Sequence, residues 1–128
     1  MPDHKGDNMR NKVLELEKSL FKVEYMSDYN YLDNIIADNF KECGKSGYLF
    51  DKKGTMDFLL SEKEDRKIDI YNFECEEITS ESWLVHYITK NNTGELIYRT
   101  SIWVMKNNLQ LLYHQASVLK EEVELKES

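Results

Sequence analysis

Apolar residues in the first part of the chain recur every three or four positions, which is the spacing of one face of an α-helix. A helix is therefore expected from Met9 onward, with an apolar stripe of Val13, Leu16, Leu20 and Val23. The charged positions between them predict a solvent-facing side of Arg10, Lys12, Glu15, Glu17 and Lys18. Two shorter helices are expected after Ser27 or Asp28 and after Asp51, because Ser and Asp cap helix N-termini and apolar residues follow at helical spacing.

The second half of the chain changes to runs that are rich in β-branched and aromatic residues, which favour strands. Strands are predicted at residues 68–78, 83–90, 95–106 and 109–119, and a short hairpin is expected within residues 40–50. The turns between the four long strands are brief, and brief turns join antiparallel neighbours rather than parallel strands. Helices followed by an antiparallel meander predict the α+β class.

Strand pairing predicts which side chains share a face of the sheet. A two-residue turn in the last hairpin sets Ser101 opposite His114, and a four-residue turn in the hairpin before it sets His86 opposite Arg99. The face that carries them is mostly apolar with a polar centre: Phe73, Cys75, Leu84, His86, Ile88, Ile97, Arg99, Ser101, Trp103, Leu112, His114, Ala116 and Val118. If the turn of the last hairpin had one more residue, the side chains that face inward would instead be those of Thr100, Gln115 and Ser117.

The opposite face is also partly apolar and aromatic, and three helices can cover only one side of such a sheet. An uncovered apolar face calls for a partner, most simply a second copy of the chain. We therefore expect a homodimer that forms through this face of the sheet.

Composition narrows the picture to one compact domain. The chain has 128 residues, 41% of them hydrophobic, with five Gly and one Pro, which is the size of a single hydrophobic core. We assign the domain to residues 9–119, a flexible N-terminus to residues 1–8 and a charged tail to residues 120–128. The two cysteines form no CxxC pair, so we expect reduced thiols rather than a disulfide scaffold.

Charge argues against two classes of partner. Acidic residues outnumber basic ones by 24 to 17, giving a net charge of −7, and such a balance repels nucleic acids and anionic membranes. No apolar run approaches the roughly 20 residues that span a bilayer, and residues 1–8 lack the apolar stretch of a secretory signal. The expected location is the cytoplasm.

Four short phrases carry a resemblance to a known family. They lie in a fixed order at residues 40–47 (FKECGKSG), 50–52 (FDK), 98–103 (YRTSIW) and 113–117 (YHQAS). In this order they resemble the nuclear transport factor 2-like (NTF2-like) superfamily, more narrowly its small bacterial SnoaL-like and ketosteroid-isomerase-like branch. The resemblance covers about residues 10–119, although Ala116-Ser117 stand where Gly-Thr is more familiar.

The resemblance implies a cone-shaped fold in which N-terminal helices pack on a strongly curved antiparallel sheet and leave a pocket at the open end. Members of this superfamily are commonly dimeric through the other sheet face. They include isomerases, cyclases, dehydratases, ligand binders and adaptors, so the fold alone implies no single activity.

The polar centre of the inward face is the candidate site. A buried cation needs an anionic partner, and histidine exchanges protons near neutral pH. Because Glu42 alternates with Phe40 and Gly44, we expect it to point inward with this group. The predicted lining of a small-molecule site is Glu42, His86, Arg99, Ser101, Trp103 and His114.

Whether this site is catalytic stays open at the level of sequence. If the protein is an enzyme, we expect cofactor-free isomerisation or dehydration, with Glu42 or His114 as the base and Arg99 stabilising negative charge. No dinucleotide or phosphate-loop motif is present, and the histidines are too far apart for a local metal motif. Neither a cofactor nor a metal is therefore expected.

The alternative is a protein-interaction module, an adaptor or an immunity-type partner, whose pocket is filled by its own side chains. In that interpretation Glu42 is a structural counter-ion of Arg99 and the acidic surface captures a basic protein. An open cavity of about 300 Å³ or more would favour a ligand over this alternative.

Overall fold

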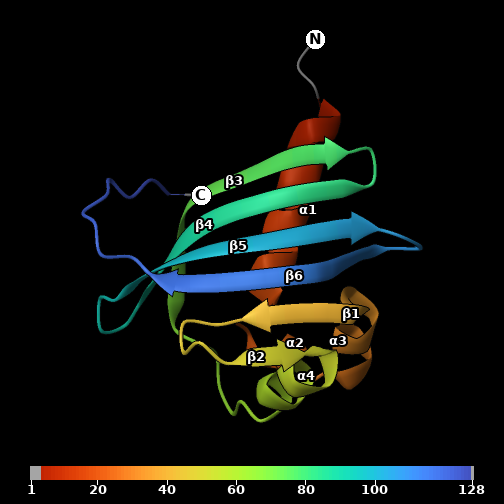
Figure 1. Ribbon diagram of the computed structural model, residues 1–128, viewed down its shortest axis with the longest axis horizontal. Helices are drawn as coiled ribbons and strands as arrows, with labels where there is room; N and C mark the ends of the chain where they lie inside the picture. The colour runs from red at the N-terminus through yellow and green to blue at the C-terminus, as the bar shows by residue number, and fades with distance from the viewer. Residues whose placement is uncertain (1–3, 128) are drawn as a thin grey trace.

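The computed structural model describes residues 4–127, and its helices lie against one side of a six-stranded sheet (Figure 1). The helices are α1 (His4–Ser19), α2 (Val23–Met26), α3 (Tyr29–Ile35) and α4 (Lys52–Leu60). The strands are β1 (Ile36–Cys43), β2 (Leu49–Asp51), β3 (Ile68–Thr79), β4 (Ser82–Asn91), β5 (Leu96–Met105) and β6 (Leu109–Val118). None of the described helices is long and apolar enough to cross a membrane.

The two predicted helix caps are confirmed. The side chain of Asp28 accepts a hydrogen bond from the Tyr31 backbone N–H at 3.0 Å and begins α3. The side chain of Asp51 accepts one from the Gly54 N–H at 2.8 Å and begins α4. Each cap satisfies an N–H group that the first helical turn leaves without a backbone acceptor.

The long first helix differs from its prediction at both ends and on its buried face. It begins at His4, before Met9, and ends at Ser19, so Val23 belongs to the separate helix α2. The face that packs on the sheet carries Val13, Leu14 and Glu17, and the solvent-facing placement of Glu17 is wrong. Tertiary packing decided this face, because the hydroxyl of a tyrosine and the indole N–H of a tryptophan on the sheet meet the Glu17 carboxylate.

The sheet order is β2-β1-β6-β5-β4-β3. The antiparallel meander from β3 to β6 is confirmed, and so is the β1–β2 hairpin. The parallel pairing of β1 with β6 was not predicted, because it joins segments that are far apart in the sequence. It sets Glu42 directly opposite His114 and so brings the first hairpin to the candidate site.

The last hairpin has the predicted register over most of its length, but its turn is longer than predicted and a bulge compensates for it. Met105 pairs with Leu109, so the turn has three residues rather than two. A one-residue bulge at Leu112 then compensates for the longer turn, and Leu111 takes the inward position that we assigned to Leu112. Beyond the bulge the predicted pairs are present: Ser101 with His114 and Arg99 with Ala116.

The β4–β5 hairpin is shifted by one residue relative to the prediction. The side-chain oxygen of Asn91 accepts hydrogen bonds from the backbone N–H groups of Thr93 and Glu95, which builds a longer turn, and Lys90 pairs with Leu96. A one-residue slip moves every side chain of a strand to the other face. The inward side chains of β4 are therefore Trp83, Val85, Tyr87 and Thr89, and the inward placement of Leu84 and His86 is wrong.

His86 lies on the outer face of the sheet. It pairs with Thr100, whose hydroxyl lies 3.0 Å from its Nδ1, and its ring stacks on Tyr98 at a centroid distance of 5.6 Å. Across the β3–β4 hairpin Cys75 pairs with Val85 rather than with His86.

An irregularity in β3 anchors the C-terminal tail. Asn72 has a positive φ of 55° at a break in the β3–β4 register, a backbone conformation that Asn tolerates better than most residues. Its backbone N–H donates to the Lys126 carbonyl at 2.8 Å and its amide donates to the Glu124 carbonyl at 3.0 Å. The tail thus lies along the exposed edge of β3, where an isolated bridge joins Tyr71 and Glu127.

Candidate functional site

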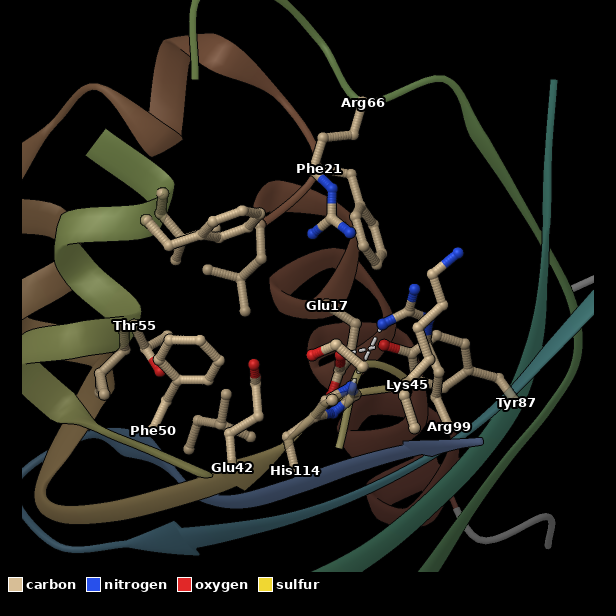
Figure 2. Close-up of a pocket in the computed structure, with 18 residues that line it drawn as sticks. Glu17, Phe21, Glu42, Lys45, Phe50, Thr55, Arg66, Tyr87, Arg99 and His114 are labelled. Carbon is tan, nitrogen blue, oxygen red and sulfur yellow. Dashed lines mark hydrogen bonds between the residues drawn. The ribbon is translucent and has the colours of Figure 1, made fainter. Parts of the chain in front are cut away.

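A cavity of about 320 Å³ lies between the helices and the inner face of the sheet (Figure 2). Helices α1 and α4, strand β1, the loop at residues 61–67 and the inner faces of β4–β6 enclose it. Its wall is mainly apolar, with Phe21, Phe50, Phe58 and Leu111 among the lining side chains. Polar groups also enter it from several elements: Glu17, Glu42, Lys45, Ser46, Thr55, Arg66, Tyr87, Arg99 and His114.

Glu17 forms the floor of this cavity and is only 2% exposed. The Trp103 indole Nε1–H donates to its carboxylate at 2.8 Å, and the Tyr87 hydroxyl donates to the other carboxylate oxygen. Burial raises the pKa of Glu17, while hydrogen bonds from Ser101, Tyr87 and Trp103 and the charge of Arg99 act in the opposite direction. Glu17 is thus a partnered group in the core rather than a free acid.

His114 sits above this floor and is held by two polar neighbours. Its Nδ1 lies 2.7 Å from the Ser101 hydroxyl, and its Nε2 lies 3.4 Å from Nη1 of Arg99. A guanidinium can only donate, so Nε2 is the acceptor and Nδ1 carries the proton that it donates to Ser101. Burial and the charges of Arg99 and Arg66 lower the pKa of His114 to about 3. His114 is therefore neutral at physiological pH.

Two guanidinium groups reach the cavity without an ionic partner. Arg99 donates through Nε to the Thr89 hydroxyl at 2.8 Å and lies over the Phe21 ring at 5.5 Å. Arg66 lies over the same ring at 5.0 Å, and Figure 2 shows its guanidinium pointing from its loop into the cavity. Within residues 4–127 neither arginine forms an ion pair. A cation stacked on an aromatic ring keeps its donors available for an anion.

Glu42 is the second carboxyl group of the cavity, and it stands apart from the first. It comes from β1, lines the cavity and receives no hydrogen bond from any residue in the described part of the chain. The expected ion pair between Glu42 and Arg99 does not form. Burial raises the pKa of Glu42, while the charges of Arg99 and Arg66 act to lower it. A raised pKa brings a carboxyl group closer to neutral pH, where it can exchange a proton.

A hydroxyl group on helix α4 also lacks a hydrogen-bond partner in the described part of the chain. Thr55 on α4 lines the cavity, is 7% exposed, and its Oγ1 makes no hydrogen bond within residues 4–127. A buried polar atom without a partner costs about 1–3 kcal/mol. The cavity thus offers a free hydroxyl, a free carboxyl group and two unpaired cations on walls that are mainly apolar, which is the make-up of a ligand pocket.

The structure brings together part of the predicted site. Glu42, Arg99 and His114 line the cavity, whereas Ser101 and Trp103 lie behind its wall, fully buried and bonded to His114 and Glu17. His86 is on the other face of the sheet, so the structure does not bring it to this group.

Sequence reasoning missed six polar groups of the cavity: Glu17, Lys45, Ser46, Thr55, Arg66 and Tyr87. A signal existed for Glu17, which lies three residues after Leu14 and four before Phe21 and therefore on their side of the helix. Tyr87 was assigned to the outer face because of the one-residue slip in β4. Arg66 lies in a loop with no periodicity, and only the tertiary structure places it.

No protein-family model matches the chain, and no curated protein matches it either. Solved structures do match it. An NTF2-like protein from Cytophaga hutchinsonii has a TM-score of 0.71 at 15% identity, over 86% of this chain and 98% of that one. An NTF2-like protein of unknown function from Prochlorococcus marinus has a TM-score of 0.68 at 16% identity, over 88% and 94%.

A third match is an uncharacterized protein with a cystatin-like fold from Caulobacter vibrioides, with a TM-score of 0.68 at 11% identity and 91% coverage of both chains. These likenesses show that the chain has the predicted NTF2-like fold, an α+β cone with N-terminal helices packed on a curved sheet. At such identities they show the fold alone. The narrower SnoaL-like and ketosteroid-isomerase-like branch stays a prediction.

Proposed function

We propose that this domain binds a small organic molecule in the cavity, with an anionic or carbonyl group of the ligand between Arg66 and Arg99 and beside Glu42. One observation carries the proposal: the cavity of about 320 Å³ is open, and its two guanidinium groups have no carboxylate partner among the described residues. Buried cations without an internal anion are costly unless an external anion or water meets them. The apolar walls would hold the body of the ligand.

If the domain is catalytic, Glu42 is better suited than His114 to act as the base. The pKa of Glu42 is raised and its carboxyl group faces the cavity without a donor. The pKa of His114 is lowered to about 3, so its neutral ring is a weak base that is already bonded to Ser101. Arg99 would stabilise negative charge that develops on a carbonyl oxygen, which is the role that cofactor-free isomerisation or dehydration requires.

A fragment screen by ligand-observed NMR tests the binding proposal. We expect small carboxylates and carbonyl compounds with an apolar body to give saturation-transfer signals with the wild-type protein. The matched control is Ala116→Phe, since Ala116 lines the cavity near the C-terminal end of β6 and a larger side chain would fill it. Fragment signals that persist unchanged in a folded Ala116→Phe protein would place the binding elsewhere and overturn the proposal.

The alternative of a protein-interaction module requires a filled pocket and a Glu42–Arg99 pair, and neither is present in residues 4–127. We therefore place small-molecule binding first. The cytoplasmic location expected from the sequence remains a prediction.

We also propose that the protein is a homodimer through the outer face of the sheet. All helices lie on the other side (Figure 1), and the outer face carries Tyr98 at 41% exposure beside the partly exposed Ile102 and Val104. Light scattering after size exclusion tests this proposal. A wild-type monomer would contradict it, whereas a dimer that dissociates in Ile102→Glu would support it.

A further inference from the structure

A second hollow lies next to the cavity and differs from it in charge. It is a groove of about 720 Å³ between the end of α1, the loop at residues 61–67, strand β3 and the β4–β5 turn. Phe21 and Arg66 line both the cavity and the groove, so the two hollows meet at these side chains. The side chains of Phe21 and Arg66 thus stand at the boundary between the cavity and the groove.

The groove reverses the charge balance of the whole chain. Five cationic side chains line it, Lys18, Lys22, Arg66, Lys67 and Lys90, against the three acidic side chains Asp65, Asp69 and Glu127. The chain as a whole has 17 basic and 24 acidic residues. A concave surface with an excess of one charge attracts ions of the opposite sign, here anions.

Most of these cations are free to meet a ligand. Among residues 4–127, Lys22, Lys67 and Lys90 form no ion pair or side-chain hydrogen bond, whereas Lys18 lies 3.7 Å from Glu15. Asp65 is already engaged, because it accepts a hydrogen bond from the Val23 N–H at 2.8 Å. Ammonium groups at several positions around one groove suit a group that spreads its charge over several oxygens, as a phosphate does.

We propose that the groove is the outer half of the ligand site and that it takes the phosphate-type group of an elongated organic anion. The apolar body of that molecule lies in the cavity, its anionic group lies among Lys22, Lys67 and Lys90, and Arg66 bridges the two parts. This inference rests on the proposed function, because it assigns a second, charged end to the ligand of the same cavity.

The C-terminal tail supplies a carboxylate that competes for this groove. Asn72 holds the tail through hydrogen bonds to Glu124 and Lys126, and Glu127 lines the groove beside the lysines. An incoming phosphate meets this negative charge. We expect Glu127→Gln to tighten the binding of a phosphate-bearing ligand by about two- to threefold, as a nearby exposed charge does.

Three probes separate the parts of the proposal: octyl phosphate, 1-octanol and inorganic phosphate, each titrated into the protein by calorimetry. Octyl phosphate should bind at least about tenfold more tightly than 1-octanol, because several partly exposed ion pairs add to the same apolar contact. Inorganic phosphate should bind much more weakly than octyl phosphate. Added salt should weaken the binding of octyl phosphate and leave the binding of 1-octanol unchanged.

The deciding variant is Lys22→Gln/Lys67→Gln/Lys90→Gln, and its matched control is Lys12→Gln/Lys106→Gln/Lys120→Gln, which removes the same charge from positions outside the groove. The groove variant should bind octyl phosphate and 1-octanol about equally, while the control keeps the wild-type preference. Loss of the preference in both variants would show that net charge alone is responsible and would overturn the inference.

The other outcomes distinguish the two proposals. Equal binding of octyl phosphate and 1-octanol to the wild-type protein would overturn the charged groove and leave the cavity as a binding site. Inorganic phosphate that binds as tightly as octyl phosphate would separate the groove from the cavity and overturn the elongated ligand. If neither octyl compound binds, the inference is overturned, whereas the proposed function stands or falls with the separate fragment screen of carboxylates and carbonyl compounds.

Discussion

Two glutamates in one cavity have opposite surroundings. Glu17 on the floor receives hydrogen bonds from Tyr87 and Trp103, whereas Glu42 on the wall receives none from the described residues. Burial raises the pKa of both. The difference indicates two roles, because a fully partnered buried carboxylate organises the core, while an unpartnered one costs stability unless a ligand meets it.

The hydroxyl groups of two threonines, Thr89 and Thr55, differ in the same way. Thr89 accepts a hydrogen bond from Arg99 at 2.8 Å, whereas Thr55 has no partner among the described residues. The region around Glu17 and Thr89 therefore has its hydrogen-bond partners, whereas in the region around Glu42 and Thr55 these two side chains make no hydrogen bond, and Arg66 and Arg99 form no ion pair, among the described residues. Stability resides in the first region and ligand binding is proposed for the second.

The largest effect is expected from Glu17→Ala. It leaves the Tyr87 hydroxyl and the Trp103 N–H buried without an acceptor and opens a void, at a cost of about 3–5 kcal/mol in the free energy of unfolding. Urea denaturation measures it. Glu17→Gln keeps one acceptor and should lose less, about 1–3 kcal/mol. A Glu17→Ala protein as stable as wild type would contradict the stabilising role of Glu17.

His114, which pairs with Glu42 in the β1–β6 register, gives the second effect, which depends on pH. Since its pKa in the folded protein is about 3 and about 6.5 in the unfolded chain, the unfolded state binds more protons between these values. Stability therefore rises with pH across this range, and His114 alone accounts for a loss of about 2 kcal/mol between pH 7 and pH 5.

Urea unfolding of wild type and His114→Gln at pH 7 and pH 5 measures this contribution. The variant should lack that part of the pH dependence. In NMR spectra the imidazole of His114 should not titrate down to pH 4, and a midpoint near 6.5 would contradict its burial in a neutral form.

Glu42→Gln should raise the free energy of unfolding, whereas the Glu17 substitutions lower it. Since the pKa of Glu42 is raised, the folded state holds its proton more tightly than the unfolded chain does. Its contribution to stability is full below the unfolded pKa and is lost as the pH rises through the folded pKa. At pH 7 the neutral amide should raise the free energy of unfolding by about 0.5–1 kcal/mol. Urea unfolding measured between pH 4 and pH 8 should show a weaker dependence of stability on pH than in the wild type. A large loss at pH 7 would reveal a structural partner.

The smallest effect is expected from Thr55→Val. Removal of a buried hydroxyl without a partner, at nearly constant shape, should raise the free energy of unfolding by about 0.5 kcal/mol. Thr89→Val is the matched control and should lose about 1–2 kcal/mol, because it removes the acceptor of a charged donor. Calorimetric melting of both variants measures the difference, and equal losses would mean that Thr55 has a partner after all.

Local patterns predicted most of the secondary structure. The caps at Asp28 and Asp51 and the four strands of the meander needed only neighbouring residues, since helix spacing, capping and alternation act over a few positions. Pairings that depend on turn length were less predictable. The Asn91 turn and the Leu112 bulge each shift a strand by one residue, and one such shift sent His86 out of the site.

By itself the sequence determined the α+β class, the helix-then-meander order and the shared face of Arg99, Ser101 and His114. The tertiary structure decided that Glu17 meets Tyr87 and Trp103, that Glu42 lies opposite His114 and that Arg66 enters the cavity. The physical reason is distance along the chain: these contacts join α1, β1 and a loop to strands many residues away. Such contacts form only when the whole core closes, so no local pattern encodes them.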